Sequence, residues 1–155
     1  MLVTKEIEID MGHRVPNHKS KCRNLHGHRY KIELGCDDKV IDEEGASDEG
    51  MVIDFSDMKE VLMDVIDRKF DHGFVMYEKD NFAKYFKIMQ GGEAFGMDNI
   101  EMPQKITFVP FIPTAENLCK YWYELLKPEL AKRNVKIKHV KVWETPTSTA
   151  IYSEE

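Results

Sequence analysis

Two segments near the start of the chain alternate apolar and polar residues with a period of two. Residues 2–13 carry acidic side chains at one parity and, at the other, Val3, Ile7, Ile9, Met11 and His13. Residues 26–36 repeat this alternation. Because successive side chains of a strand point to opposite faces, we predict two strands that are each half buried.

The hydrophobic period then becomes that of an amphipathic helix. Between Phe55 and Lys69 the apolar residues recur at helical spacing, and Ser56 is a candidate N-cap. A second helix is predicted to begin at Pro113-Thr114, and Pro128 is expected to kink or end it. Two more strands are predicted in KIKHVKVWET and TAIY. Strands joined by hairpins, with helices grouped between them, indicate an α+β fold whose sheet is covered on one face.

The region from about 74 to 112 has no readable period. It contains GGEAFGMDNIEMPQK, which makes it longer than most connections in a compact domain. We therefore expect an insertion or lid here. A chain of 155 residues is long enough for one well-cored domain, so residues 1–155 are predicted to form a single domain that includes this insertion.

Composition narrows the function classes. A formal charge of −6 argues against a general nucleic-acid binder, which needs a basic surface. No apolar run reaches the length of a membrane span, and MLVTKEIEID lacks the features of a secretory signal. The three cysteines are irregularly spaced and odd in number, which fits a reducing cytoplasm rather than a disulfide framework.

The segment CRNLHGHRY combines a cysteine with two histidines. His26 and His28 are two residues apart on a predicted strand, so their side chains share a face. His13 has the inward parity of the preceding strand, and pairing of the strands would bring three imidazoles together. Three histidines with an open fourth position are typical of catalytic zinc. Ordinary surface or core histidines remain the alternative on spacing alone.

Gly27 and two other histidines have different expected roles. Gly27, between the paired histidines, would let a metal or ligand approach the strand backbone. His18 lies in a predicted loop, which makes it a weaker ligand candidate. His139 lies in a Lys-rich strand and is expected to be solvated.

Cys22 precedes the histidine pair, between Lys21 and Arg23. Neighbouring positive charge lowers a thiol pKa and favours the thiolate, which suits proton abstraction or nucleophilic attack. A small buried hydrophobe is the alternative interpretation of the same residue. The basic residues around the motif could attract an anionic substrate, or could be ordinary solvated side chains.

Several acidic residues are candidates for acid–base or binding roles. Asp71 could orient His72, although a cap at the helix C-terminus is an alternative. Glu144 has the parity of apolar residues in its strand, so a partner is needed if it is buried. A ligand with two adjacent N–H donors would satisfy it. Glu116 either interacts with the helix dipole or faces the same site.

Together, the blocks MGHRVP, CRNLHGHRY, GMVIDFSDMK, FDH, PTAENL and WET resemble the 6-pyruvoyl-tetrahydropterin synthase family. Within that family they are most similar to the 6-carboxy-tetrahydropterin synthases of queuosine biosynthesis. The resemblance implies the tunnelling fold, with a four-stranded antiparallel sheet and two helices on one face. It also implies a homohexamer, built as a dimer of trimers, with active sites between subunits.

The resemblance also implies residue roles. Zinc ligands would be His13, His26 and His28; catalytic residues would be Cys22, Asp71 and His72; substrate-binding residues would be Glu144, Glu116 and Thr145. The substrate would be a pterin triphosphate, 7,8-dihydroneopterin triphosphate. The family's usual double histidine is replaced by His72-Gly73 here, so the second histidine of that motif is absent.

The spacing before the histidine pair separates two family activities. Three residues stand between Cys22 and His26, as in the carboxy type, whereas the pyruvoyl type usually has five. The resemblance therefore favours a zinc-dependent lyase that releases acetaldehyde and triphosphate. A pyruvoyl-type synthase and a non-catalytic pterin- or zinc-binding homologue remain the alternatives.

Overall fold

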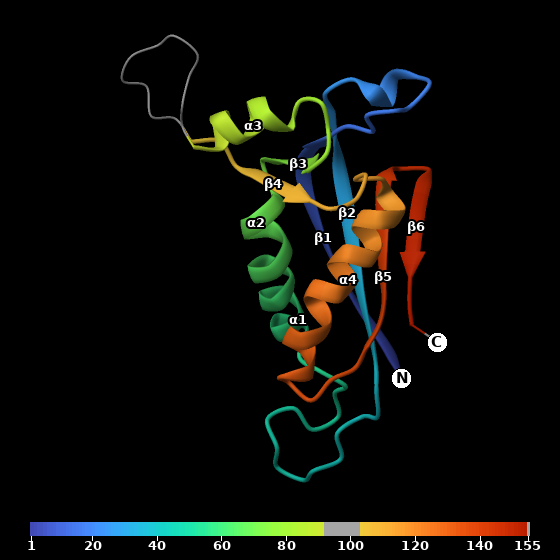
Figure 1. The fold of residues 1–155 in the computed structure, drawn as a ribbon. Coiled ribbons are helices and arrows are strands. Elements are labelled where there is room, and N and C mark those ends of the chain that lie inside the picture. The colour runs from blue at the N-terminus through green and yellow to red at the C-terminus, as the bar shows by residue number, and fades with distance from the viewer. Residues whose placement is uncertain (92–102, 155) are drawn as a thin grey trace.

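The computed structural model of the protein describes residues 1–91 and 103–154. Its strands form one six-stranded sheet in the order β4-β3-β1-β2-β5-β6 (Figure 1). The strands are β1 (Leu2–His13), β2 (His26–Asp37), β3 (Gly73–Tyr77), β4 (Ile106–Val109), β5 (Ile137–Thr145) and β6 (Ser148–Tyr152). The helical segments are η1 (Lys21–Arg23), α1 (Phe55–Leu62), the π-helical turn η2 (Met63–Asp67), α2 (Arg68–Phe70), α3 (Ala83–Gln90) and α4 (Ala115–Ala131).

The sheet contains the four antiparallel strands that the sequence predicts, but the predicted total of four is wrong. β1 and β2 pair without interruption from Leu2↔Asp37 to His13↔His26, and β5 and β6 continue the antiparallel ladder. β3 and β4 extend the sheet on the other side of β1, in parallel. These two strands are only five and four residues long, which is too short for a clear alternation in the sequence.

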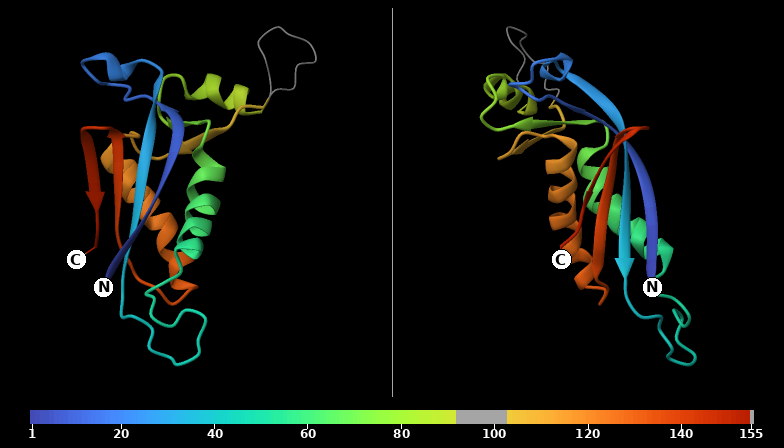
Figure 2. Two further views of the ribbon diagram at one scale, coloured as in Figure 1. Left: turned by 180° about the vertical axis from the view of Figure 1, so that it is seen from behind. Right: turned by 90° about the vertical axis from the view of Figure 1, so that its right-hand side faces the viewer.

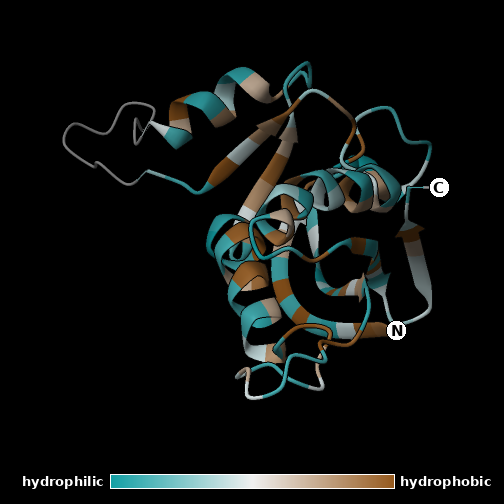
Figure 3. Cartoon of the chain, turned by 90° about the horizontal axis from the view of Figure 1, so that it is seen from below, coloured by the Kyte–Doolittle hydropathy of each residue, from teal (hydrophilic) through white to brown (hydrophobic). Residues whose placement is uncertain are grey.

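The α1–η2–α2 segment and α4 lie on the same side of the sheet (Figure 2). Their apolar sides and the inward residues of the strands form the main core, in which the rings of Phe70 and Trp122 stand 5.8 Å apart. In Figure 3, hydrophobic and hydrophilic residues alternate around these helices, as expected for amphipathic helices packed on a sheet. The predicted α+β architecture is therefore confirmed.

The ends of the two long helical segments differ in detail from the prediction. Asp54, not Ser56, caps α1: its carboxylate accepts a hydrogen bond from the Ser56 amide at 2.6 Å. Ser56 is already inside the first turn, where its amide needs an acceptor. Thr114 caps α4, and the helix continues past Pro128 to Ala131.

The expected insertion at about 74–112 holds β3, α3 and β4, and its residues 92–102 lie outside the described part of the chain. A small second cluster joins α3 to the strand pair; its buried members are Met76, Ala83, Phe86 and Ile106. A buried ion pair between Arg14 and Asp80, at 2.9 Å, ties this unit to the end of β1. Among the described residues, no helix has the length and apolar content needed to cross a membrane.

Candidate metal centre and adjoining cavities

Three histidines meet at the end of the sheet where β1 leads into β2. The ladder places His13 opposite His26 and Met11 opposite His28, and strand alternation turns all three imidazoles to the helix-covered face. One ring nitrogen from each histidine lies within 4.8 Å of those of the other two. The structure therefore brings together the three histidines that the sequence singles out.

Hydrogen bonds fix the orientation of two of these rings. Nδ1 of His13 donates to the Pro113 carbonyl, and Nδ1 of His26 donates to the Asn24 carbonyl, each at 2.7 Å. A carbonyl can only accept, so each Nδ1 carries the proton and each Nε2 keeps its lone pair. A backbone carbonyl bound to the second nitrogen is the usual support of a metal-ligating histidine.

The donor set fits a divalent metal such as zinc. Nε2 of His26 is buried and has no hydrogen-bond partner among the described residues. A buried lone pair without a partner is costly unless a ligand uses it. Three imidazole nitrogens around one point, without cysteine, match a catalytic rather than a structural zinc site.

His13 and His28 are held in the neutral form that metal binding requires. Burial lowers the pKa of His13 to about 4, and the nearby His26 and His28 add to this effect. Burial also lowers the pKa of His28, although Glu144 partly opposes the shift. At neutral pH both rings can offer a lone pair without first losing a proton.

We expect metal-free protein to lose stability as the pH falls from about 6.5 towards about 4. His13 has a pKa of about 4 in the fold, whereas an unfolded histidine titrates near 6.5. Between these values the unfolded chain binds a proton that folded His13 does not, so acidification favours unfolding by up to about 3 kcal/mol. Above about pH 6.5 His13 is neutral in both the folded and the unfolded state, so it no longer makes the free energy of unfolding depend on pH.

Urea denaturation of chelator-treated protein at several pH values measures this loss. His13→Asn should flatten the dependence, because asparagine does not titrate. An equally steep dependence in the variant would assign the loss to other groups.

A cavity of about 230 Å³ adjoins the histidines. Cys22 enters it from η1, Glu116 from the first turn of α4, and Glu144 from β5, and His13 forms part of the same wall. Cys22 is partly buried and free of any disulfide. The structure thus places the thiol, two carboxylates and a histidine of the cluster around one space.

Asp71 and His72 pair with each other, with 2.6 Å between the Asp71 carboxylate and Nδ1 of His72. The β1 backbone holds both: the Asp10 amide donates to Asp71, and the His72 amide donates to the Asp10 carbonyl. Partial burial opposes ionisation of Asp71, but the bonds from Asp10 and His72 outweigh it and lower its pKa. His72 has a left-handed φ of 53° and a side chain that is 78% exposed.

This pair does not share the cavity of Cys22. His72 lines a separate space of about 420 Å³, together with His28 and Arg29. Within one chain, the structure therefore brings Cys22 and Glu116 together, and Asp71 with His72, but it does not join the two groups.

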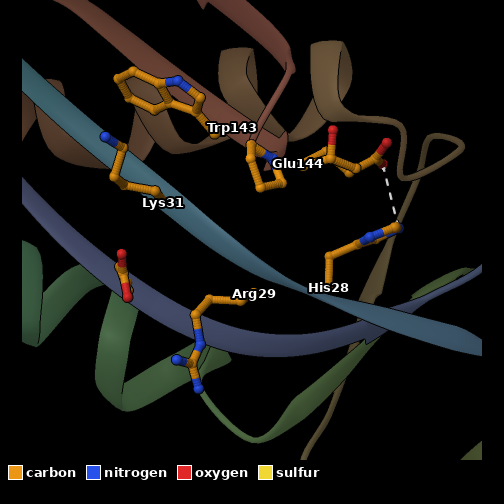
Figure 4. A pocket seen from close by; sticks show the side chains of 8 residues that line it. His28, Arg29, Lys31, Trp143 and Glu144 are labelled. Carbon is orange, nitrogen blue, oxygen red and sulfur yellow. Dashed lines mark ion pairs between the residues drawn. The ribbon is translucent and has the colours of Figure 1, made fainter.

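Glu144 stands at the boundary between two cavities. It also lines a space of about 450 Å³ with Thr145 and Trp143, where β2 and β5 separate. Figure 4 shows the side chains of Glu144 and His28 approaching each other, while Arg29 points away from both. The carboxylate is 4.0 Å from Nε2 of His28 and 3.6 Å from Nε2 of His13.

The sequence interpretation missed Tyr30, whose hydroxyl lies among His13 and Glu144. Burial, followed by the charge of Glu144, raises the pKa of Tyr30 far above its ordinary value. The sequence does contain a signal for this position: Tyr30 follows His28 by two residues, so both side chains lie on the same face of β2.

A Cβ at Gly27 would come within 2.8 Å of the Met11 carbonyl, so close packing of β1 against β2 requires glycine there. The approach of a metal or ligand to this backbone stays a prediction. The expectation for a histidine outside the cluster is wrong. His139 is not simply solvated: its Nε2 lies 2.8 Å from the Glu33 carboxylate, and its side chain is largely buried.

Comparison with known proteins identifies the family. The family model described as 6-pyruvoyl tetrahydropterin synthase matches residues 2–155, and this chain belongs to that family. Relatives named 6-carboxy-5,6,7,8-tetrahydropterin synthase occur in Haemophilus influenzae and Rickettsia felis. The first is 32% identical, covering 98% of this chain and 98% of the relative. The second is 33% identical, covering 92% and 93%. These relatives place the chain in an enzyme family.

Solved structures agree on the fold. An uncharacterized protein from Wolinella succinogenes superposes with a TM-score of 0.77 at 24% identity, over 100% of this chain and 98% of the other. The 6-pyruvoyl tetrahydropterin synthase of Caenorhabditis elegans gives 0.66 at 22% identity, over 100% and 96%. The predicted tunnelling fold is therefore confirmed.

Proposed function

We propose that this protein is a zinc-dependent 6-carboxy-5,6,7,8-tetrahydropterin synthase, a lyase. Its reaction converts 7,8-dihydroneopterin triphosphate and water to 6-carboxytetrahydropterin, acetaldehyde and triphosphate. The pathway is the biosynthesis of queuosine and related 7-deazaguanines, in the cytoplasm. The observation that carries the proposal is the cavity that joins Cys22, Glu116 and Glu144 to a ready-made three-histidine centre.

The proposed ligands of zinc are His13, His26 and His28. Bound zinc supplies Lewis-acid chemistry at the side-chain hydroxyls of the substrate, which lowers the barrier to proton loss. The Nδ1 hydrogen bonds of His13 and His26 keep their rings aimed at one point. This orientation is provided by the fold before any ligand binds.

Proton transfer is assigned to Cys22 and to the Asp71–His72 pair. Elimination of triphosphate and cleavage of the side-chain carbon bond both need groups that accept and return protons. Asp71 holds Nδ1 of His72, which leaves Nε2 free to exchange a proton. Glu144 accepts hydrogen bonds from the amino-pyrimidinone edge of the pterin, with Glu116 and Thr145 beside it.

The separation of Cys22 from His72 supports a site shared between subunits. The two residues line different cavities of one chain, so a second copy is the simplest source of a complete catalytic set. The proposed assembly is a homohexamer made of two trimers.

The choice of the carboxy product rests on the three residues between Cys22 and His26 and on the names of the relatives that match this chain over nearly its full length. The alternative is a 6-pyruvoyl-tetrahydropterin synthase, favoured by the name of the family model and of the nematode structure. A non-catalytic homologue would need no proton-transfer groups.

Product analysis tests the proposal. Zinc-loaded protein incubated with 7,8-dihydroneopterin triphosphate is expected to release one acetaldehyde and one triphosphate for each 6-carboxytetrahydropterin, measured by mass spectrometry and an aldehyde assay. Chelator-treated protein serves as the control and should regain turnover when zinc is restored. Triphosphate release without acetaldehyde would indicate the pyruvoyl reaction, and no turnover by zinc-loaded protein would contradict both enzymes.

A further inference from the structure

Tyr30 closes the floor of the candidate centre. Its side chain is 0% exposed, and its ring packs edge-on against Trp122 at 6.0 Å between centroids. The rings of His13 and His28 stand 5.8 and 5.6 Å from it. The phenol is therefore enclosed by the core on one side and by imidazoles on the other.

A buried phenol hydroxyl requires an acceptor for its proton. The oxygen of Tyr30 is 3.3 Å from Nδ1 and 3.2 Å from Nε2 of His13. An oxygen that is almost equidistant from both ring nitrogens does not lie along the lone-pair direction of either one. Neither nitrogen of His13 is therefore a well-directed acceptor for the Tyr30 hydroxyl. Among the described residues, the remaining acceptor is Oε1 of Glu144, at 3.5 Å.

Glu144 in turn needs a donor. Its Oε1 is close to Nε2 of His13 and of His28, but a nitrogen that binds a metal carries no proton to donate. Within the described part of the chain, this leaves the Tyr30 hydroxyl as the group that can donate to the carboxylate. A phenol is protonated at neutral pH, because its ordinary pKa is about 10.

We propose that Tyr30 is a positioning residue for pterin recognition: its hydroxyl donates to Oε1 of Glu144 and fixes the direction in which the carboxylate meets the substrate. The inference rests on the proposed function, because it takes Glu144 as the pterin anchor. A carboxylate that is already held in place loses less freedom when the ligand binds. In this proposal Tyr30 acts through Glu144 and is assigned neither as a metal ligand nor as a proton-transfer group.

Tyr30→Phe tests this role, because it removes the hydroxyl and keeps the ring against Trp122. In zinc-loaded protein, the affinity for unsubstituted pterin, measured by fluorescence titration, is expected to fall about 10-fold. Zinc content should stay equal to that of the wild type, and KM should rise by a larger factor than kcat falls. Tyr123→Phe is the matched control, since Tyr123 is another buried tyrosine, packed on Tyr152 at 5.0 Å.

A double-mutant cycle identifies the route of the effect. In a Glu144→Ala background, Tyr30→Phe is expected to cause no further loss, because the hydroxyl acts through the carboxylate. An unchanged pterin affinity in Tyr30→Phe, an equal loss in both backgrounds, or a loss of zinc would overturn the role of Tyr30. Failure of the zinc-loaded wild type to bind pterin would instead overturn the proposed function.

Discussion

Replacement of Cys22 by alanine is expected to reduce turnover by about 10²- to 10⁴-fold while zinc and pterin still bind. The thiol lines the cavity beside the three histidines but is not part of the group whose nitrogens converge. Its loss therefore removes a proton-transfer group and leaves the proposed metal ligands and Glu144 in place. Single-turnover kinetics, metal analysis and a pterin titration on one preparation would measure the three quantities separately.

Cys36→Ala provides the matched control. Cys36 is buried in the core, and burial raises the pKa of its thiol to about 12, so it stays protonated and inert. Alanine there should leave kcat nearly unchanged, apart from a modest loss of stability. If Cys22→Ala kept most of its turnover, or lost zinc together with turnover, the proposed role of the thiol would be wrong.

Replacement of His26 by alanine is expected to weaken zinc binding by more than about 100-fold and to abolish turnover. The buried Nε2 of His26 is the atom of the cluster that most clearly lacks a partner, and a metal would supply one. Two histidines alone leave zinc with too few protein ligands for a stable site. Competition with a chromophoric chelator measures the affinity directly, without an activity assay.

His18→Ala is the companion variant, because His18 lies in the loop between β1 and β2, shortly before His26, but outside the converging group. It should keep the zinc affinity of the wild type. An unchanged affinity in His26→Ala would refute the metal assignment, and an equal loss in both variants would indicate that the loop, rather than the ligand, controls binding.

The sequence was sufficient to predict that the three histidines would meet if the two strands paired, and the structure shows this pairing. Period-two alternation fixed the inward faces of both long strands, and a hairpin joining them brings His13 opposite His26. It was also sufficient for the helix-covered sheet, because the helical face between Phe55 and Lys69 is continuous in the sequence. These features depend on local periodicity, which a single sequence displays.

Features that depend on contacts between distant segments were not predictable in this way. β3 and β4 are recognisable only after they pair with β1 and with each other. Tyr30 looks like any inward strand residue until β5 brings Glu144 to its hydroxyl. The separation of Cys22 from His72 is likewise visible only in the folded chain, where the two residues line different cavities.

Because the ladder between β1 and β2 is uninterrupted, the arrangement of the three histidines does not depend on the length of the loop that carries Cys22. Strand pairing alone sets the relation of His13 to His26 and His28, so residues can be inserted into or deleted from the connecting loop without disturbing the trio. The position of the Cys22 thiol relative to the histidines, by contrast, depends on how many loop residues separate Cys22 from His26. Loop length can therefore change the position of Cys22 while the arrangement of the three histidines stays constant.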